Sequence, residues 1–237
     1  FMVVNGMVDF GYTGLVANEY GWWMVQNGSI NFAYTGLAAN EYGWWYVENG
    51  QVTFAKDSIE YGTVKGKKGW WHIKGSQVVY DTTLAENGNG WWYVKNGQVD
   101  FTYNGFAENE YGWWYLEDGY VTLKKNSIEY GTVDKKTGWW HVKDIRVVYD
   151  TTVAENENGW WYVKDGKVDF AYDGLAENEN GWWYVKNGQV DFKYNGFAEN
   201  EYGWWYLEDG KVTFAKNGVE YGTVKGKTGW WHIKESQ

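Results

Sequence analysis

The chain has 237 residues, a formal net charge of −10, and neither cysteine nor proline. The lack of cysteine excludes disulfides, thiol nucleophiles and thiolate metal sites, and the acidic balance argues against a nucleic-acid partner, because phosphate backbones repel it. No segment reaches the roughly 18 apolar residues that a membrane-spanning helix needs, so we expect a chain that does not span a membrane.

The chain is an internal repeat. All 20 tryptophans fall in ten Trp-Trp pairs, and these pairs begin at residues 22, 44, 70, 91, 113, 139, 160, 182, 204 and 230. Successive pairs are 21, 22 or 26 residues apart, and a longer unit of 69 residues relates Trp22, Trp91 and Trp160. The first residues match an internal stretch of the repeat and the last residues also fall within one. We therefore expect residues 1–237 to be a single continuous repeat array of about ten hairpins, cut from a longer protein.

Residues 159–180 show the repeating unit most clearly. The aromatic and β-branched run 160–163 is followed by Asp165-Gly166 and then by a second run at 168–172, in which Asp169 is one of several recurrent acidic residues. Asn-Gly or Asp-Gly between two such runs is the strongest local signal for a β-hairpin, because a type I′ turn needs positive φ at both central residues. Three repeats carry other dipeptides, Gly75-Ser76, Asp144-Ile145 and Glu235-Ser236, and there we expect less regular hairpins.

The 26-residue variant of the repeat contains an additional alternating segment, as at 58–64 and 219–224, which predicts an added short strand before a loop rich in lysine and glycine. No helical periodicity is present, and the irregular spacing does not suit a β-propeller, whose blades need about 40–50 residues each. An isolated two-stranded hairpin is marginal in water, whereas stacked hairpins cover one another. The predicted fold is therefore all-β, a β-solenoid of stacked β-hairpins built from 21–26-residue Trp-Trp repeats.

The two tryptophans of a pair point to opposite faces of a strand. The second Trp shares its face with the fourth residue of the run, which is aliphatic in all ten repeats, and this predicts a core position. The first Trp shares its face with a Tyr, a His or, once, Met24, which predicts a wetter face or the seam between repeats. The alternative is that both tryptophans belong to the core.

Rows of Trp and Tyr bind sugar rings and quaternary ammonium groups through stacking and cation–π contacts. The first Trp and its Tyr neighbour are accordingly the candidate ligand-binding residues: Trp22, Trp44, Tyr46, Trp91, Tyr93, Trp113, Tyr115, Trp160, Tyr162, Trp182, Tyr184, Trp204 and Tyr206.

Catalytic or metal chemistry is not expected. The recurrent carboxylates of the second run (Asp9, Asp100, Asp169 and Asp191) lack the spacing of a calcium loop and are interpreted as a solvated face. His72, His141 and His232 occupy one repeat position far apart in sequence, which indicates Tyr-to-His variation rather than a metal site. No nucleophile triad, phosphate loop or dinucleotide fingerprint is present. We therefore predict no catalytic residue, no metal and no cofactor, and a chain that is not an enzyme.

The run Trp160-Trp161-Tyr162-Val163, its turn, the strand that ends at Gly174 and the following Leu175-Ala176 resemble the choline-binding and related cell-wall-binding repeats of Gram-positive surface proteins. They also resemble the repeats of glucan-binding domains and of clostridial toxin receptor-binding tails. The resemblance implies a β-solenoid of hairpins, in the choline-binding case with about three hairpins per superhelical turn, so that a 69-residue unit would form one turn.

One departure from that family matters. Its repeats carry a Trp after the strand-ending glycine that forms part of the choline box, whereas this chain has Leu15, Leu37, Phe106, Leu175 and Phe197 at the matching positions. A choline site built in the same way lacks one wall in the regular repeats, which favours glycan or protein binding over choline.

The predicted function is therefore that of a bacterial extracellular module, secreted or cell-wall-associated. It would attach to a polysaccharide, a cell-envelope polymer or a host surface, with a cell-wall or host glycan or a surface protein as its partner. The alternative is a structural spacer or stalk of a surface adhesin that has no ligand of its own.

Overall fold

The computed structural model describes residues 1–121 and 126–237. These residues form β-strands, turns and loops without a helix, and the strand ladders are antiparallel. Accordingly, the described part of the chain has no helix that could cross a membrane. The prediction of an all-β chain of repeated hairpins is confirmed.

Each repeat uses three kinds of strand. A leading strand precedes the Trp pair: β3 (Gly14–Asn18), β6 (Gly36–Asn40), β9 (Ser58–Val64), β12 (Thr83–Asn87), β15 (Gly105–Asn109), β17 (Ser127–Val133), β20 (Thr152–Asn156), β23 (Gly174–Asn178), β26 (Gly196–Asn200) and β29 (Gly218–Val224). The Trp strand contains the pair: β4 (Gly21–Gln26), β7 (Gly43–Val47), β10 (Lys67–Lys74), β13 (Gly90–Lys95), β16 (Gly112–Leu116), β18 (Lys136–Lys143), β21 (Gly159–Lys164), β24 (Gly181–Lys186), β27 (Gly203–Glu208) and β30 (Lys227–Ile233). A short strand usually follows: β2 (Met7–Val8), which pairs with β1 (Val3–Val4), β5 (Ser29–Ile30), β8 (Gln51–Val52), β11 (Gln77–Val78), β14 (Gln98–Val99), β19 (Arg146–Val147), β22 (Lys167–Val168), β25 (Gln189–Val190) and β28 (Lys211–Val212).

The longest pairing in a repeat lies before the Asn-Gly turn, not after it. Strand β23 pairs with β24 over five residues, from Gly174↔Val185 to Asn178↔Gly181, whereas β25 pairs with β24 over two. The predicted second strand at 168–172 is therefore wrong beyond Val168, because the Asp169 carboxylate accepts the N–H of Ala171 at 2.9 Å and turns the chain away. The recurrent carboxylates thus terminate strands rather than lie in them.

The two-residue turns join one repeat to the one before it. The N–H of Gly188 donates to the carbonyl of Tyr172 at 2.9 Å, and the carbonyl of Gly188 accepts the N–H of Tyr162 at 2.8 Å. Gly188 has φ +75°, and a Cβ atom there would lie 2.5 Å from the Asp169 carbonyl oxygen. Glycine is needed at this position both for the backbone conformation and for the close approach of the neighbouring repeat. We call this contact the turn junction.

The three unusual dipeptides form regular turns, so the expectation of less regular hairpins is wrong. Both residues of each have positive φ, as at Gly75 (φ 54°) and Ser76 (φ 64°), and the strand pairing around Gly75-Ser76 and Asp144-Ile145 is the usual two residues. Ser76 is fully buried, and its hydroxyl accepts the N–H of Lys56 at 3.1 Å. A side chain fits at this turn junction because it hydrogen-bonds to the preceding repeat instead of colliding with it.

The 26-residue variant has the strand predicted at 58–64, which is β9, but this strand corresponds to the leading strand of a regular repeat and is not an additional one. The variant lengthens the existing hairpin: β9 and β10 pair over seven residues around the turn Lys65-Gly66, where φ is 48° and 78°. Each variant hairpin is therefore longer than a regular one, and it places a tyrosine opposite its first Trp, as in the pair Tyr130↔Trp139.

The core follows the fourth residue of each Trp run. This aliphatic side chain is at most 1 % exposed in all ten repeats, which confirms its predicted core position. Among the second tryptophans, Trp45, Trp71, Trp140 and Trp183 are buried and the rest are half-buried. The first tryptophans are half-buried as well, apart from the exposed Trp230. The difference in burial between the second Trp and the first Trp of a pair is thus smaller than predicted.

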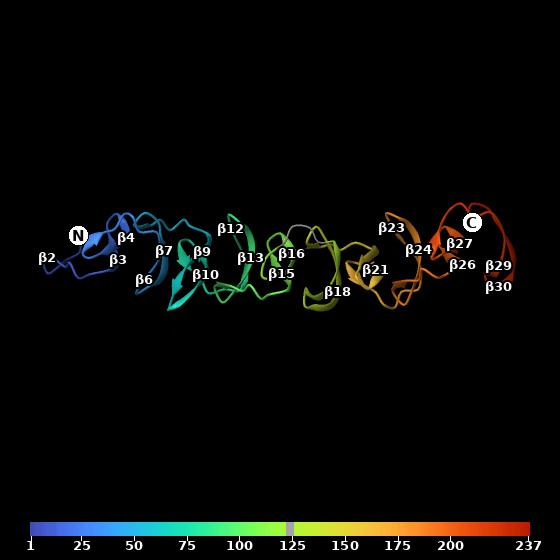
Figure 1. Cartoon of the computed structure of the whole chain (residues 1–237), viewed down its shortest axis with the longest axis horizontal. Coiled ribbons are helices and arrows are strands. Elements are labelled where there is room, and N and C mark those ends of the chain that lie inside the picture. The colour runs from blue at the N-terminus through green and yellow to red at the C-terminus, as the bar shows by residue number, and fades with distance from the viewer. Residues whose placement is uncertain (122–125) are drawn as a thin grey trace. The chain divides into compact units, whose positions relative to one another are not determined.

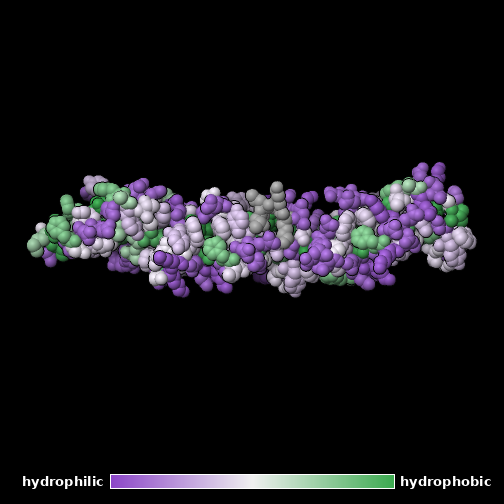
Figure 2. Space-filling model, viewed as in Figure 1, coloured by the Kyte–Doolittle hydropathy of each residue, from purple (hydrophilic) through white to green (hydrophobic). Residues whose placement is uncertain are grey.

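The hairpins form two compact units, residues 1–111 with 116–122 and residues 112–115 with 123–237. Within the second unit, strands β21, β24 and β27 follow one another in chain order (Figure 1). The visible surface is mostly hydrophilic, with separate hydrophobic residues between the charged ones (Figure 2).

The turn junction yields a prediction about stability. Gly188→Ala should lower the free energy of unfolding by about 1–3 kcal/mol more than Gly226→Ala, because the new methyl group must displace neighbouring backbone. Gly226 has a similar φ of +72°, and no other described atom lies within 4 Å of an added Cβ. Its substitution therefore costs only the free energy of holding a non-glycine residue in the left-handed conformation, about 1–2 kcal/mol. Urea denaturation followed by tryptophan fluorescence measures both. Equal losses would show that close packing at the junction is unimportant.

Candidate functional site: aromatic pockets and grooves between repeats

The first Trp of a regular repeat lies in the seam with the next repeat. The ring of Trp160 is 5.0 Å from that of Trp183 and 5.8 Å from that of Phe192. Trp22 makes the same contacts with Trp45 at 5.0 Å and Phe54 at 5.9 Å. Three aromatic rings from two repeats are thus in contact. The seam between repeats is one of the two positions predicted for the first Trp.

The seam after the variant repeat that contains Trp139 is open instead. Trp139 contacts its cross-strand neighbour Tyr130, with ring centroids 5.4 Å apart. A cavity of about 230 Å³ then lies between Trp139 and the next repeat, lined also by Trp161, Phe170, Ile128 and Val168, with Asn156 and Asn158 at its polar positions. The rings of Trp161 and Phe170 pack edge to face with their centroids 5.6 Å apart. These two aromatic surfaces, at a fixed angle to each other, face the third ring of the pocket, that of Trp139. We call this cavity the aromatic pocket.

The same set of residues recurs 69 positions earlier in the first unit. Trp70 contacts Tyr61 at 5.5 Å, and Trp92 meets Phe101 edge to face at 5.6 Å. Trp70 and Trp92 pack against one cluster of buried residues that includes Ile59 and Val99, as Trp139 and Trp161 do around Ile128 and Val168. The residues of this arrangement therefore occur in both units, and in the first unit the ring of Tyr120 also lies 4.6 Å from that of Trp92.

The residue two positions before a Trp pair, here called the connector residue, determines what else contacts the preceding first Trp. Where it is tyrosine, its ring lies against that Trp: Tyr42 on Trp22 at 5.5 Å, Tyr111 on Trp91 at 6.1 Å and Tyr202 on Trp182 at 6.0 Å. Asparagine takes its place at 89, 158 and 180, which follow Trp70, Trp139 and Trp160. The aromatic pocket contains one of these asparagines, Asn158, and a larger groove contains another, Asn180.

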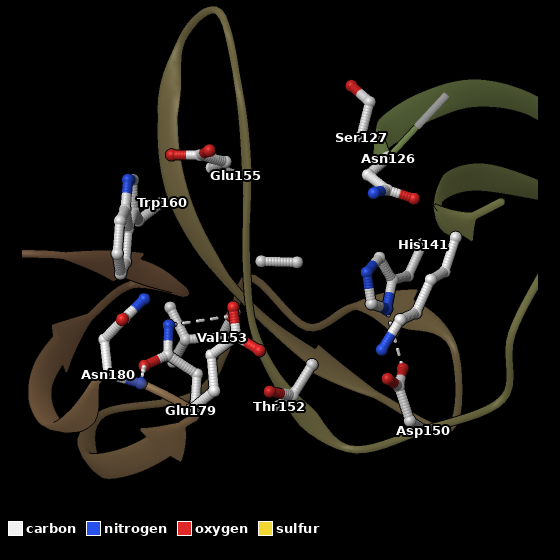
Figure 3. A pocket seen from close by; sticks show the side chains of 13 residues that line it. Asn126, Ser127, His141, Asp150, Thr152, Val153, Glu155, Trp160, Glu179 and Asn180 are labelled. Atoms are coloured by element: carbon white, nitrogen blue, oxygen red, sulfur yellow. Dashed lines mark hydrogen bonds and ion pairs between the residues drawn. The ribbon is translucent and has the colours of Figure 1, made fainter. Parts of the chain in front are cut away.

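This larger groove, groove 1, has a volume of about 510 Å³ and is lined mainly by polar side chains. Trp160 stands on one side of it, and His141 and Asp150 lie on the other, joined by a 2.8 Å contact between Nδ1 and Oδ1 (Figure 3). Groove 2, of about 470 Å³, lies one repeat further along and includes Tyr162, Tyr172 and Trp182 together with four carboxylates. Both grooves lie within the second unit.

Asn178 ties the wall of groove 1 to the core. Its side-chain oxygen accepts the indole N–H of Trp183 at 2.9 Å and the backbone N–H of Asn180 at 2.9 Å, while its amide donates to the Val153 carbonyl at 3.2 Å. One side chain thus fixes a core tryptophan, the turn at Asn180 and the preceding repeat.

The candidate tyrosines are more engaged in packing than the sequence indicated. Tyr93, Tyr162 and Tyr184 stack on Tyr103, Tyr172 and Tyr194 with centroids 3.7 Å apart. The hydroxyl of Tyr172 donates to the Leu175 carbonyl at 2.6 Å. Burial raises the pKa of both Tyr162 and Tyr172, so these phenols stay neutral at neutral pH. At least one face of each stacked ring is therefore unavailable to a ligand.

The remaining candidates are also held by neighbours. Trp44 and Tyr46 pack on the cluster that contains Leu37 and Trp71, and the indole N–H of Trp113 donates to Asp134 at 3.1 Å. The backbone N–H of Tyr115 donates to the carbonyl of Ile145. The ammonium of Lys216 lies 5.1 Å from the ring centre of Tyr206, and the side chain of Trp204 is half-buried. Of the candidate residues, the structure places Trp160 in groove 1 and brings Tyr162 and Trp182 together in groove 2.

The aromatic residues of the pocket are not among the candidate residues predicted from the sequence. Trp139 has His141 instead of a tyrosine as its neighbour, Trp161 is predicted to be a core residue, and Phe170 is not one of the predicted site residues. Two signals were available in the sequence: the tyrosine that the variant repeat places opposite its first Trp, and the replacement of Tyr by Asn at the connector position. Among the described residues, no three His, Asp or Glu side chains gather as metal ligands would.

Comparison with known proteins identifies the repeats. A family model described as a choline-binding repeat matches seven segments, residues 11–31, 33–53, 80–100, 102–122, 149–169, 171–191 and 193–213, which together exceed half of the chain. The chain belongs to the choline-binding repeat family. The matched segments are regular repeats, so the aromatic pocket lies where the unmatched variant repeat containing Trp139 meets a matched one.

Solved structures of Streptococcus pneumoniae proteins are similar to this chain at low identity. CbpJ is 15 % identical, with 94 % of this chain and 86 % of that chain covered and a TM-score of 0.35. Choline binding protein F is 13 % identical, with 94 % and 91 % covered and a TM-score of 0.30. The autolysin LytC in complex with a synthetic peptidoglycan ligand is 15 % identical, with 91 % and 50 % covered and a TM-score of 0.34. A search of curated proteins finds no match.

The hydrogen bonds of Asn178 yield a second prediction. Asn178→Ala should lower the free energy of unfolding by about 2–3 kcal/mol, because it removes three hydrogen bonds and leaves an indole N–H without its acceptor in a buried site. Asn180→Ala, at an exposed position on the same turn, should stay within about 0.5 kcal/mol of the parent. Thermal and urea unfolding of both variants measure this. Similar stabilities for the two would contradict the role assigned to Asn178.

Proposed function

We propose that this chain is a non-catalytic cell-surface binding module that holds quaternary ammonium groups of an envelope polymer in the aromatic pockets beside its variant repeats. In this proposal the hairpins stack as a β-solenoid, and the protein is extracellular, secreted or cell-wall-associated. The observation that carries the proposal is the pocket formed by Trp139, Trp161 and Phe170.

The pocket has the chemistry that a quaternary ammonium group requires. Such a cation cannot donate hydrogen bonds and is recognised by the electron-rich faces of several aromatic rings. Three aromatic rings with an aliphatic base at Ile128 and Val168 match this requirement. The net charge of −10 favours the approach of a cation over that of an anion.

The proposal departs from the preference for a glycan or protein ligand that the sequence suggested. That preference rested on the missing aromatic residue at Leu175 and its equivalents. In the structure Leu175 is buried in the core, and Phe170, five positions earlier, lines the pocket together with Trp139 and Trp161. Membership of the choline-binding repeat family supports the same class of ligand.

Choline and its neutral carbon isostere, 3,3-dimethylbutan-1-ol, test the proposal when titrated into the full chain by calorimetry. We expect choline to bind about tenfold more tightly, because a desolvated cation–π contact is worth about 1–2 kcal/mol and 1.4 kcal/mol corresponds to a factor of ten. The double variant Asn89→Tyr/Asn158→Tyr should weaken choline binding by at least about tenfold, since a tyrosine at the connector position places its ring against the preceding first Trp.

Asn180→Tyr is the matched control, because it introduces the same residue at a connector position outside the aromatic pocket. Equal affinity for the neutral isostere, or undiminished choline binding by the double variant, would contradict the assignment. If the chain retains no choline and no envelope polymer, the spacer or stalk becomes the better account of its function.

A further inference from the structure

We infer that groove 1, around Trp160, is a second binding site whose ligand is a short neutral oligosaccharide. This site is separate from the aromatic pocket and does not depend on the function proposed for it. Its volume of about 510 Å³ lies within the range of roughly 300–1,000 Å³ that is typical of small-molecule sites.

Trp160 provides a fixed surface for a sugar ring. Its contacts with Trp183 and Phe192 hold the indole in the seam, so little side-chain entropy remains to be lost on binding. Its connector residue is Asn180, whereas tyrosine lies against the equivalent Trp22, Trp91 and Trp182. The ring of Trp160 thus lines the groove without a tyrosine from the connector against it.

The polar side chains of groove 1 suit hydroxyl groups. Lys143, Asn126 and Asn180 supply donors, and Asp150, Glu155 and Glu179 supply acceptors. A sugar hydroxyl both donates and accepts, so a lining that mixes the two kinds can satisfy several hydroxyls at once. In Figure 3 Glu155 and Glu179 lie on the side of Trp160, and Asn126 and Asp150 lie on the side of His141.

The charges of groove 1 select against anions. Three carboxylates line it with one ammonium group, Lys143, so a uronate or phosphate would meet net repulsion. Groove 2 has an equivalent position but is a poorer site: its lining includes Asp173, Glu177, Glu199 and Glu201, and Tyr202 contacts its tryptophan, Trp182. These differences assign the saccharide site to groove 1.

The experiment titrates the full chain with chitotriose, cellotriose and trigalacturonate by calorimetry. We expect at least one neutral trisaccharide to bind at least about tenfold more tightly than the anionic one. Asn180→Tyr should weaken neutral binding by at least about tenfold, because the added ring would lie against Trp160. This variant is expected to fold, because tyrosine occupies the same position before four other Trp pairs, at residues 20, 42, 111 and 202.

Asn158→Tyr is the control, since it alters the aromatic pocket and leaves groove 1 unchanged, and saccharide binding should match that of the parent. Trp160→Phe keeps a ring against Trp183 and should reduce the affinity by a smaller factor. The inference is overturned if neither neutral trisaccharide binds, if trigalacturonate binds equally well, or if Asn180→Tyr and Asn158→Tyr behave alike. Choline binding by Asn180→Tyr stays normal in either case, so this outcome is independent of the aromatic pocket.

Discussion

The structure depends on one repeated contact, the turn junction, in which a two-residue turn lies against the backbone of the preceding repeat. At Gly188 this contact consists of two backbone hydrogen bonds and an approach so close that no side chain fits. Because both partners are backbone groups, the contact is insensitive to which side chains surround it. The aromatic residues can therefore differ from seam to seam while the spacing between repeats is maintained.

The variant repeat shows how that freedom is used. Its longer hairpin keeps the regular turn junction, with Ser76 accommodated by a hydrogen bond to Lys56. At the same time it places a tyrosine opposite the first Trp, and in the second unit the seam beyond Trp139 is open where the seam beyond Trp160 is closed. A change in hairpin length at one end of a strand thus alters the chemistry of a seam without altering the way in which repeats join.

Much of the fold could be predicted from the sequence, because it is governed by local rules. Asn-Gly turns and an aliphatic residue at the fourth position of each run have direct structural meaning, and residues such as Val163 and Val185 are fully buried as expected. The second strand was over-extended because alternation at 168–172 resembles a strand, while the Asp169 hydrogen bond that ends it depends on a side-chain conformation. The aromatic pocket was missed for a different reason: it joins Trp139 to Phe170, and contacts between repeats cannot be obtained from the periodicity of either one.

Adding repeats to an array usually increases its length and its number of binding sites together. The placement of the variant repeat separates these two properties. One variant hairpin occurs in each 69-residue unit, whereas the additional 22-residue copy in the last third of the chain consists of a regular repeat alone. Duplicating the short unit therefore extends the reach of the array, and duplicating the long one also raises the number of seams that follow a variant repeat, where the aromatic pocket lies. Avidity grows with the number of sites that can be engaged together, so the two kinds of duplication would tune length and binding strength independently.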